Sequence, residues 1–127
     1  MKFYIGTGFQ NKDLVNNVSK KLISKGLHHT YNWASNISTH ETIDDMIKSS
    51  ELEQQAIIDS DIVIILLPAG RGTHIELGIA LALNKKIYLC SLDGKDFDVE
   101  NSVNFYQNPN IIRLVGNIDS IIEKIVK

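Results

Sequence analysis

The stretch Asp61–Leu83, with the sequence DIVIILLPAGRGTHIELGIALAL, decides the fold of this chain. It opens with an apolar, β-branched run, passes through a turn that contains proline and glycine, and ends in a segment typical of a helix. A strand, a glycine-rich turn and a helix in this order direct backbone N–H groups and a helix N-terminus at an anionic ligand. Glu76 is the one acid between Arg71 and Lys85, and a lone carboxylate in an apolar helix requires an explanation.

Segments with strand patterns alternate with segments with helical patterns along the whole chain. We expect strands at residues 2–5, 28–33, 61–67, 86–91 and 111–115, and helices at residues 13–25, 38–60, 73–84 and from 117 onward. Such alternation implies a parallel sheet with helices on both faces and right-handed crossovers. We therefore predict a single α/β domain over residues 1–127. Its fold is expected to be a doubly wound, flavodoxin-like parallel sheet of five strands in the order 2-1-3-4-5.

Composition narrows the class of protein. With 127 residues, 43% of them apolar and 22% charged, the chain can bury one core and has the composition of an ordinary soluble globule. Its net charge of −2 gives no electrostatic basis for binding nucleic acid or a membrane surface. The apolar start of the chain is too short for a signal peptide and no other segment could span a bilayer, so we expect a cytoplasmic protein.

Cysteine and histidine usage argues against a metal centre. Cys90 is the one cysteine and lies in an apolar run, so we expect a buried structural thiol. The four histidines lack the spacing of metal ligands, and we predict no metal and no cofactor. His74, beside the glycine-rich turn, is expected to be at most a wall of a pocket.

The topology itself predicts where a ligand binds. In doubly wound sheets, ligands bind beyond the carboxyl ends of the strands, where the strand order reverses. The loops at that edge are residues 6–10, 33–38, 68–73 and from 91 onward. They hold the paired glycines, Trp33 and Arg71, so a pocket is expected there before any chemistry is considered.

Glu76 admits two interpretations. Thr73-His74-Ile75-Glu76 is a capping box, in which Thr73 would be the N-cap and Glu76 would only stabilise its own helix end. Alternatively, Glu76 points into the pocket, and the helix dipole holds it ionised as a nucleophile or an electrostatic stabiliser. A second capping box, with Ser38 as N-cap and Glu41 reaching back, is expected to open the preceding helix.

Three of these features together resemble a known family. They are FYIGTGF near the start, an acid (Glu53) eight residues before Asp61, and the segment PAGRGTHIELGIAL. The set resembles the nucleoside 2-deoxyribosyltransferases and is similar to their relatives that hydrolyse nucleoside 5′-monophosphates. The resemblance covers residue 2 to about residue 115, and its most specific part is the ELGxA motif that begins at Glu76.

The resemblance implies roles for particular residues. In the family the glutamate of the ELG motif, here Glu76, attacks C1′ of the sugar and forms a glycosyl-enzyme intermediate. The tyrosine of the first strand, here Tyr4, hydrogen-bonds that carboxylate. The family's aspartate that assists departure of the base is replaced here by Glu53. Asn110 matches an asparagine that family members lend to a neighbouring subunit's sugar site, which implies a homodimer or a higher homo-oligomer.

The chemistry of N-glycosidic cleavage agrees with such a pair of acids. The reaction develops an oxocarbenium-like sugar, which a carboxylate beneath C1′ stabilises or captures, and the leaving base needs a proton or a hydrogen bond. Glu53 is the first choice for the second carboxyl, although a solvated acid on a helix would have the same pattern. Asp59 and Asp61 are the competitors, and Asp61 more simply caps the start of a strand.

The loops at the pocket edge supply the candidates for substrate binding. The residues suited to hold a 5′-phosphate at a helix N-terminus are Gly70, Arg71, Gly72 and Thr73. Gly6 and Gly8 offer a second place for the phosphate, and Phe9 and Trp33 are candidates to sandwich the base. The alternatives are an arginine in a solvent-exposed loop, glycines that only form a tight turn and aromatic rings that only pack in the core.

We therefore predict an enzyme that cleaves the N-glycosidic bond of a (2′-deoxy)nucleoside or nucleoside 5′-monophosphate. The reaction is expected to run through a covalent glycosyl-Glu76 intermediate and to pass the sugar to another base or to water. The alternative is a module of the same fold that binds or senses a nucleotide without turnover, and the replacement of the family's aspartate by Glu53 keeps it open. In both cases the partner is a small-molecule nucleoside or nucleotide.

Overall fold

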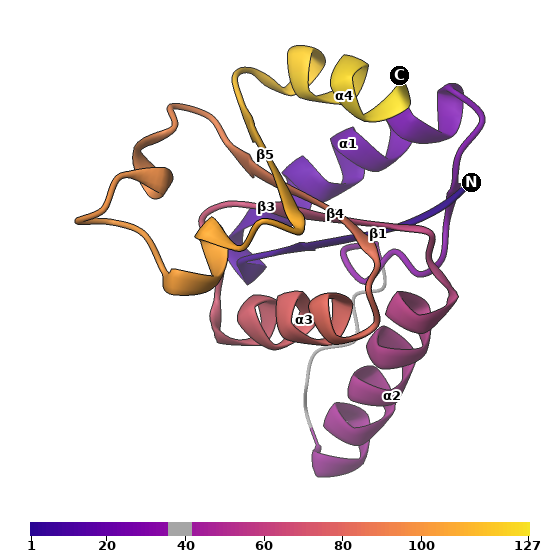
Figure 1. Ribbon diagram of the computed structural model, residues 1–127. Coiled ribbons are helices and arrows are strands. Elements are labelled where there is room, and N and C mark those ends of the chain that lie inside the picture. Colours follow the sequence, from indigo (N-terminus) through magenta and orange to yellow (C-terminus); the bar gives the residue numbers. More distant parts are fainter. Residues whose placement is uncertain (36–41) are drawn as a thin grey trace.

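A computed structural model describes residues 1–35 and 42–127 of the chain. They form one five-stranded sheet in which all strands are parallel, in the order β2-β1-β3-β4-β5 (Figure 1). The strands are β1 (Lys2–Thr7), β2 (His28–His29), β3 (Ile62–Leu66), β4 (Lys86–Ser91) and β5 (Ile111–Val115). The α-helices are α1 (Lys12–Ser24), α2 (Ile43–Asp59), α3 (Arg71–Ala82) and α4 (Ile118–Val126). The predicted fold class and strand order are confirmed.

The helices cover both faces of the sheet. Helices α1 and α4 pack on one face and α2 and α3 on the other (Figure 1). We call these the α1/α4 face and the α2/α3 face. Strand β1 alternates between them, because Phe3 and Ile5 belong to the core of the α1/α4 face and Tyr4 to that of the α2/α3 face. All five residues of β3 are buried, as its continuous apolar run predicts.

The first two strands differ in length from the prediction. Strand β1 continues to Thr7, so Gly6 lies inside the strand rather than in the turn that follows it. Strand β2 ends at His29 instead of reaching residue 33. Where β2 has ended, a side chain supplies the hydrogen bond that a neighbouring strand would give to β1. The indole Nε1–H of Trp33 donates to the backbone carbonyl of Ile5 at 2.8 Å. This hydrogen bond fixes the Trp33 ring beside the carboxyl end of the sheet.

Helix α2 is one unbroken helix. Its sequence predicts an inward apolar face made of Ile43, Met46, Ile47, Leu52, Ala56 and Ile57, and only part of that face is buried. Thr42 is its N-cap, and the Thr42 side chain accepts a hydrogen bond from the N–H of Asp45 at 3.1 Å. The predicted capping box at Ser38–Glu41 lies outside the described residues. Of the apolar residues expected to face inward, Ala56 and Ile57 are buried, whereas the other four are exposed: Ile43, Met46, Ile47 and Leu52. The prediction was wrong for the N-terminal part of α2, because that part extends past the sheet (Figure 1).

The remaining elements agree closely with the sequence. Asn117 directly precedes the apolar helical pattern at the end of the chain, which predicts it as the N-cap of α4. The structure confirms this, because its side-chain oxygen accepts from the N–H of Ser120 at 2.9 Å. In α1 the helical spacing of Leu14, Val18, Leu22 and Ile23 predicts the apolar face. Val18 and Leu22 are buried together with Val15, whereas Ile23 is exposed. Cys90 is buried, and burial raises the pKa of its thiol to about 12, consistent with a structural role. In residues 1–35 and 42–127, no helix combines the length and the apolar character needed to cross a membrane.

Candidate active site

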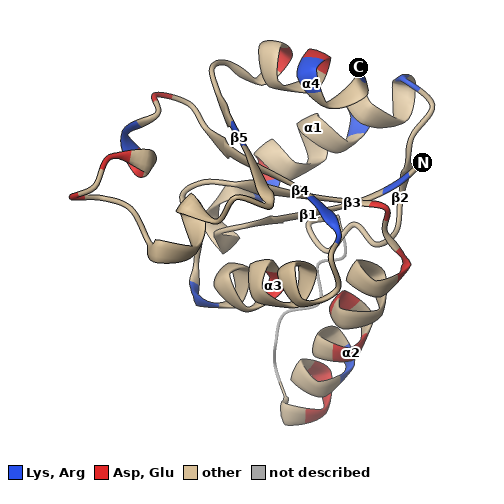
Figure 2. Cartoon of the chain, in the orientation of Figure 1, with Lys and Arg blue, Asp and Glu red and all other residues tan. Residues whose placement is uncertain are grey.

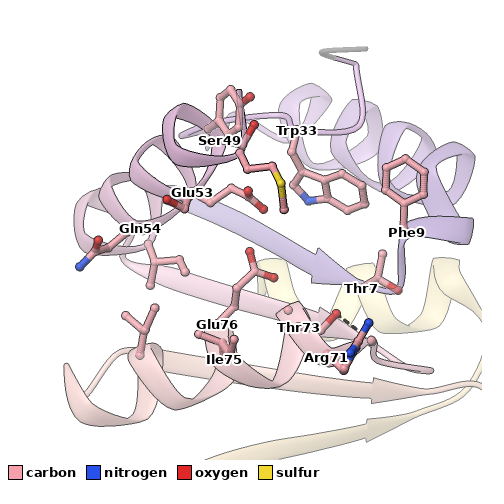
Figure 3. A pocket seen from close by; sticks show the side chains of 17 residues that line it. Thr7, Phe9, Trp33, Ser49, Glu53, Gln54, Arg71, Thr73, Ile75 and Glu76 are labelled. Carbon is pink, nitrogen blue, oxygen red and sulfur yellow. Dashed lines mark hydrogen bonds between the residues drawn. The ribbon is translucent and has the colours of Figure 1, made fainter. Parts of the chain in front are cut away.

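A cavity of about 840 Å3 opens on the α2/α3 face of the sheet, in the size range of small-molecule sites. Figure 3 shows side chains that line it. The wall from α3 and its preceding turn consists of Gly70, Arg71, Gly72, Thr73, Ile75, Glu76 and Ile79. The wall from α2 consists of Met46, Ser49, Ser50, Glu53, Gln54 and Ile57. The carboxyl end of β1 and the chain after β2 add Thr7, Phe9, Tyr31 and Trp33.

Glu76 does not serve its own helix end. Helix α3 begins at Arg71 with Gly70, instead of Thr73, as its N-cap. Thr73 takes the N3 position of the cap and accepts the Gly70 N–H on its Oγ1 at 3.0 Å. Glu76 therefore lies in the second turn, beyond the reach of the free N–H groups. The capping interpretation of Glu76 was wrong, because the N-cap is Gly70, three residues before the Thr73 that the sequence pattern indicated.

Glu53 and Glu76 meet at the hydroxyl of Tyr4. Glu53 projects from α2 and Glu76 from α3, and both point into the cavity with Trp33 close by (Figure 3). The Tyr4 hydroxyl donates to Oε2 of Glu76, and it lies 3.4 Å from Oε1 of Glu53. The three groups come from three different elements, so the arrangement exists only in the folded chain.

The pKa of Glu76 reflects this crowding. Burial raises it, the hydrogen bond from Tyr4 lowers it, and the charge and hydrogen bond of Glu53 raise it again, to about 8. The expectation that the helix dipole holds Glu76 ionised was wrong, because Glu76 lies past the first turn of α3 and burial raises its pKa. At neutral pH the pair of carboxyls, Glu53 and Glu76, therefore retains a proton. The pKa of Tyr4 is raised by burial and by both carboxylates, so its hydroxyl remains a donor.

Gly6 makes room for the Glu76 carboxylate. A Cβ at this position would lie 2.9 Å from Oε1 of Glu76 and 3.1 Å from Cδ1 of Ile65. A side chain at Gly6 would therefore displace the Glu76 carboxylate and push Ile65 aside by a few tenths of an ångström. Gly6 lies beside the cavity but outside its lining. Gly8 is also outside the lining, and its N–H donates to the carbonyl of Pro68 at 3.1 Å.

The turn that contains Gly8 and the turn that contains Gly70 pack against each other at the edge of the cavity. A Cβ on Gly70 would lie 3.7 Å from the Cα of Gly8, so the turn after β1 packs directly on the turn before α3. Arg71 and Gly72 follow in the exposed first turn of α3. Figure 2 shows a basic position at the start of α3, where Arg71 lies, whereas acidic residues are spread along α2. Backbone N–H groups and a guanidinium at a helix N-terminus suit an anion.

Phe9 and Trp33 form an aromatic wall. Their ring centroids are 6.4 Å apart and their planes differ by 24°, and the Lys12 ammonium lies 4.7 Å from the Phe9 centroid. Phe9 is 66% exposed, whereas Trp33 packs on the cores of both faces. The two predicted base-binding rings are thus together on one side of the cavity.

Four other candidates lie away from the cavity. Asp61 accepts the backbone N–H of Lys2 at 2.9 Å, as a strand cap would, and Asp59 accepts the Gln55 amide at 2.9 Å. Asn110 precedes β5 and lines a separate hollow with Asn84, Lys85 and Lys86. His74, predicted as a wall of the pocket, turns away from it toward Tyr106. In the described part of the chain, no group of three or more His, Cys, Asp or Glu residues could hold a metal ion.

Sequence reasoning missed most of the α2 wall. Positions 46, 49, 50, 53 and 57 follow the spacing of a single helix face, and this spacing was available in the sequence. The signal was hidden because the face mixes Met, Ser and Glu, and because the apolar residues of α2 pointed to a core-facing helix.

Comparison with known proteins places the fold. No protein-family model matches the sequence, and no curated protein is similar to it in sequence. The chain is similar in structure to CMP N-glycosidase BcmB of Clostridium botulinum, with a TM-score of 0.70, 20% identity and coverage of 98% of each chain. It is also similar to a conserved protein from Enterococcus faecalis V583, with a TM-score of 0.69, 18% identity and coverage of 98% of this chain and 96% of that one. At these identities the similarity establishes a shared fold, a doubly wound α/β protein with a five-stranded parallel sheet.

Proposed function

We propose that this chain cleaves the N-glycosidic bond of a nucleoside 5′-monophosphate or a (2′-deoxy)nucleoside, and that it is a relative of the nucleoside 2-deoxyribosyltransferases and nucleotide N-glycosidases. The observation that carries the proposal is the pair of carboxyls, Glu53 and Glu76, at one buried hydroxyl in a nucleotide-sized cavity. The shared fold with a protein described as a CMP N-glycosidase supports it. So do the motifs around Tyr4 and Glu76.

The proposed reaction has two steps. Ionised Glu76 attacks C1′ of the sugar while the bond from C1′ to the base nitrogen breaks, and the electron pair of that bond leaves with the base. Protonated Glu53 donates its proton to the departing base. In the second step Glu53, now a base, takes a proton from water, which attacks C1′ and releases Glu76. If a second base attacks instead, the sugar is transferred rather than hydrolysed.

The protonation of the pair fits this scheme. Two close carboxyls in a desolvated site do not both ionise, so the pair retains one proton. The mechanism needs that proton on Glu53 and the charge on Glu76. The Tyr4 hydroxyl favours this distribution, because it donates to Glu76 and lowers the pKa of that carboxyl.

Substitution of Glu76 tests the proposal. Wild type, Glu76→Gln and a matched exposed control, Glu51→Gln, are incubated with the common nucleosides and their 5′-monophosphates, and free base is measured by chromatography. We expect wild type and Glu51→Gln to release base from at least one substrate, and Glu76→Gln to be slower by about 10³-fold or more. Base release that survives in Glu76→Gln would remove Glu76 from the chemistry.

Two further proposals concern the substrate and the assembly. We propose that a 5′-phosphate sits at Gly70, Arg71, Gly72 and Thr73, so Arg71→Ala should weaken binding of a 5′-monophosphate more than binding of its nucleoside. Equal losses for both ligands would refute this. We also propose that the chain forms a homo-oligomer in which Asn110 reaches a neighbouring sugar site, and sedimentation of wild type and Asn110→Ala tests that assembly.

A module that binds nucleotides without turnover is the second candidate. The feature that favours it is Glu53, because the nucleoside 2-deoxyribosyltransferases have at this position the aspartate that assists departure of the base. Measurable binding of 5′-monophosphates by wild type without any base release would support this module over the enzyme.

A further inference from the structure

The side chain of His74 bridges the start of α3 and a distant turn of the chain. Its Nδ1 lies 3.0 Å from the carbonyl oxygen of Gly70, and its Nε2 lies 2.8 Å from the hydroxyl of Tyr106. The two rings are nearly parallel, with centroids 5.8 Å apart and an angle of 12° between their planes. Neither residue lines the cavity, so the contact is not explained by the proposed chemistry.

The direction of both hydrogen bonds follows from the partners. A carbonyl oxygen only accepts, so Nδ1 of the neutral ring carries the proton and donates it to Gly70. Nε2 is then an acceptor, and Tyr106 donates its hydroxyl proton to it. Burial and the nearby Asp96 carboxylate raise the pKa of Tyr106, which keeps that proton in place.

Tyr106 is itself held firmly. It is 5% exposed and lies in the short 3₁₀ turn Asn104–Gln107. Its N–H donates to the carbonyl of Val103 at 2.8 Å, and its carbonyl accepts from Nη1 of Arg113 at 3.1 Å. Because Arg113 belongs to β5, this hydrogen bond ties the Tyr106 backbone to the sheet, and burial restricts the ring.

Gly70 is consequently restrained at both of its backbone polar groups. Its carbonyl accepts from the backbone N–H of His74 at 3.2 Å as well as from the ring, and its N–H donates to Thr73. Gly70 lines the cavity, and Arg71 and Gly72 follow it directly. The orientation of these backbone groups determines where a phosphate can sit at this helix start.

We propose that His74 and Tyr106 are a positioning pair that fixes Gly70 and the first turn of α3 for the 5′-phosphate of the substrate. This inference rests on the proposed function, since it deepens the role of the same cavity. The pair touches neither the sugar nor the base. It acts through the Gly70 carbonyl, so its loss should affect recognition of the phosphate and leave the glycosidic step intact.

Amide substitutions at His74 separate the two hydrogen bonds. An Asn amide reaches the place of Nδ1 and can still donate to Gly70, whereas a Gln amide reaches the place of Nε2 and can bond only Tyr106. We expect His74→Asn to keep KM near the wild-type value. His74→Gln and His74→Ala should raise KM for a 5′-monophosphate about fivefold, the effect of one hydrogen bond. The kcat for that substrate and the KM for its nucleoside should not change.

Tyr106→Phe and a control complete the test. Tyr106→Phe should raise KM for the 5′-monophosphate by a smaller factor, because the Gly70 contact remains. Phe105→Ala, an exposed neighbour in the same turn, should leave KM unchanged. The inference is overturned if His74→Gln and His74→Ala change KM for nucleoside and 5′-monophosphate equally, or if His74→Asn is as impaired as His74→Ala.

A binding measurement keeps this result separate from that of the proposed function. Binding of inorganic phosphate to each variant is followed by the NMR shifts of the Arg71 and Gly72 amides. We expect wild type and His74→Asn to bind phosphate most tightly. Tyr106→Phe should bind it less tightly, and His74→Gln and His74→Ala least tightly. Absence of phosphate binding at these amides, or equal binding by all variants, would contradict the positioning role. Base release from the same samples shows whether the glycosidic chemistry stands independently.

Discussion

The two faces of the sheet use the same strands for opposite purposes. On the α1/α4 face, β1 contributes Phe3 and Ile5, and α1 fills the space above them with apolar side chains such as Leu22. On the α2/α3 face, β1 contributes Tyr4 and Gly6, and the helices above them carry Glu53 and Glu76 around a cavity. Each face has a buried apolar core, and the α2/α3 face also leaves space for a ligand.

The difference also appears in the helices. Helix α1 lies along the sheet and buries Val15, Val18 and Leu22, whereas α2 buries Ala56 and Ile57 near its end and leaves its first half exposed. A buried carboxyl pair costs stability, because desolvation opposes its ionisation. Burial of apolar side chains in the cores of both faces offsets this cost.

The largest expected effect concerns the α2/α3 face. Glu53→Gln should slow base release from a nucleotide by about 10²–10⁴-fold, because the departing base loses its proton donor. Stability should be unchanged or higher, since repulsion with Glu76 is relieved. A deoxyribosyl nitrophenol, whose leaving group needs no proton, should be cleaved at nearly the wild-type rate. If both substrates slow equally, Glu53 is not the acid.

Truncation of a core side chain on the α1/α4 face should change the free energy of unfolding by nearly as much as Glu53→Gln changes the activation free energy of base release. Leu22→Ala removes a fully buried side chain and should lower the free energy of unfolding by about 2–5 kcal/mol, with base release per folded molecule unchanged. Met46→Ala, on the exposed half of α2, is the matched control and should cost less than about 1 kcal/mol. Urea titration measures both. Similar losses would mean that α2 is packed as tightly as α1.

Removal of the Tyr4 hydroxyl should have a smaller effect on the rate. Tyr4→Phe deletes a hydrogen bond to a charged carboxylate and should slow base release by about 10- to 100-fold. Because that bond lowers the pKa of Glu76, the acidic limb of the pH–rate profile should also move to higher pH. A slower enzyme with an unmoved acidic limb would show that Tyr4 does not act through Glu76.

The most gradual effect is the pH dependence of stability, which is spread over several pH units. The pKa of Glu76 in the folded chain is about 8, above its ordinary value of 4.5. Between these values the folded state keeps a proton that the unfolded state has released, so stability falls as pH rises, by at most about 1.4 kcal/mol per unit. Denaturant unfolding of Glu76→Gln at about pH 5 and about pH 8 should show a flatter dependence than wild type. An equal dependence in both would assign it to other groups.

The fold and the chemical character of the site were accessible from the sequence. Regular alternation of strand and helix patterns predicted the sheet and its order, and the glycine turn after β3 predicted the pocket edge. The start of α3 was misplaced, because Thr73 can cap a helix from either the N-cap or the third position and only the path of the chain distinguishes them. The exposed half of α2 was misjudged because helical periodicity identifies an apolar face without stating what covers it.

Local sequence by itself determined the elements, their parallel order and the residue types available at the carboxyl edge of the sheet, because these depend on side-chain periodicity and on turn chemistry. Only the tertiary structure decided that Glu53 of α2 and Glu76 of α3 meet at Tyr4 of β1, and that His74 reaches Tyr106 instead of the cavity. These contacts join residues between 32 and 72 positions apart in the chain. Their geometry is set by how helices pack on a twisted sheet, which no local pattern encodes.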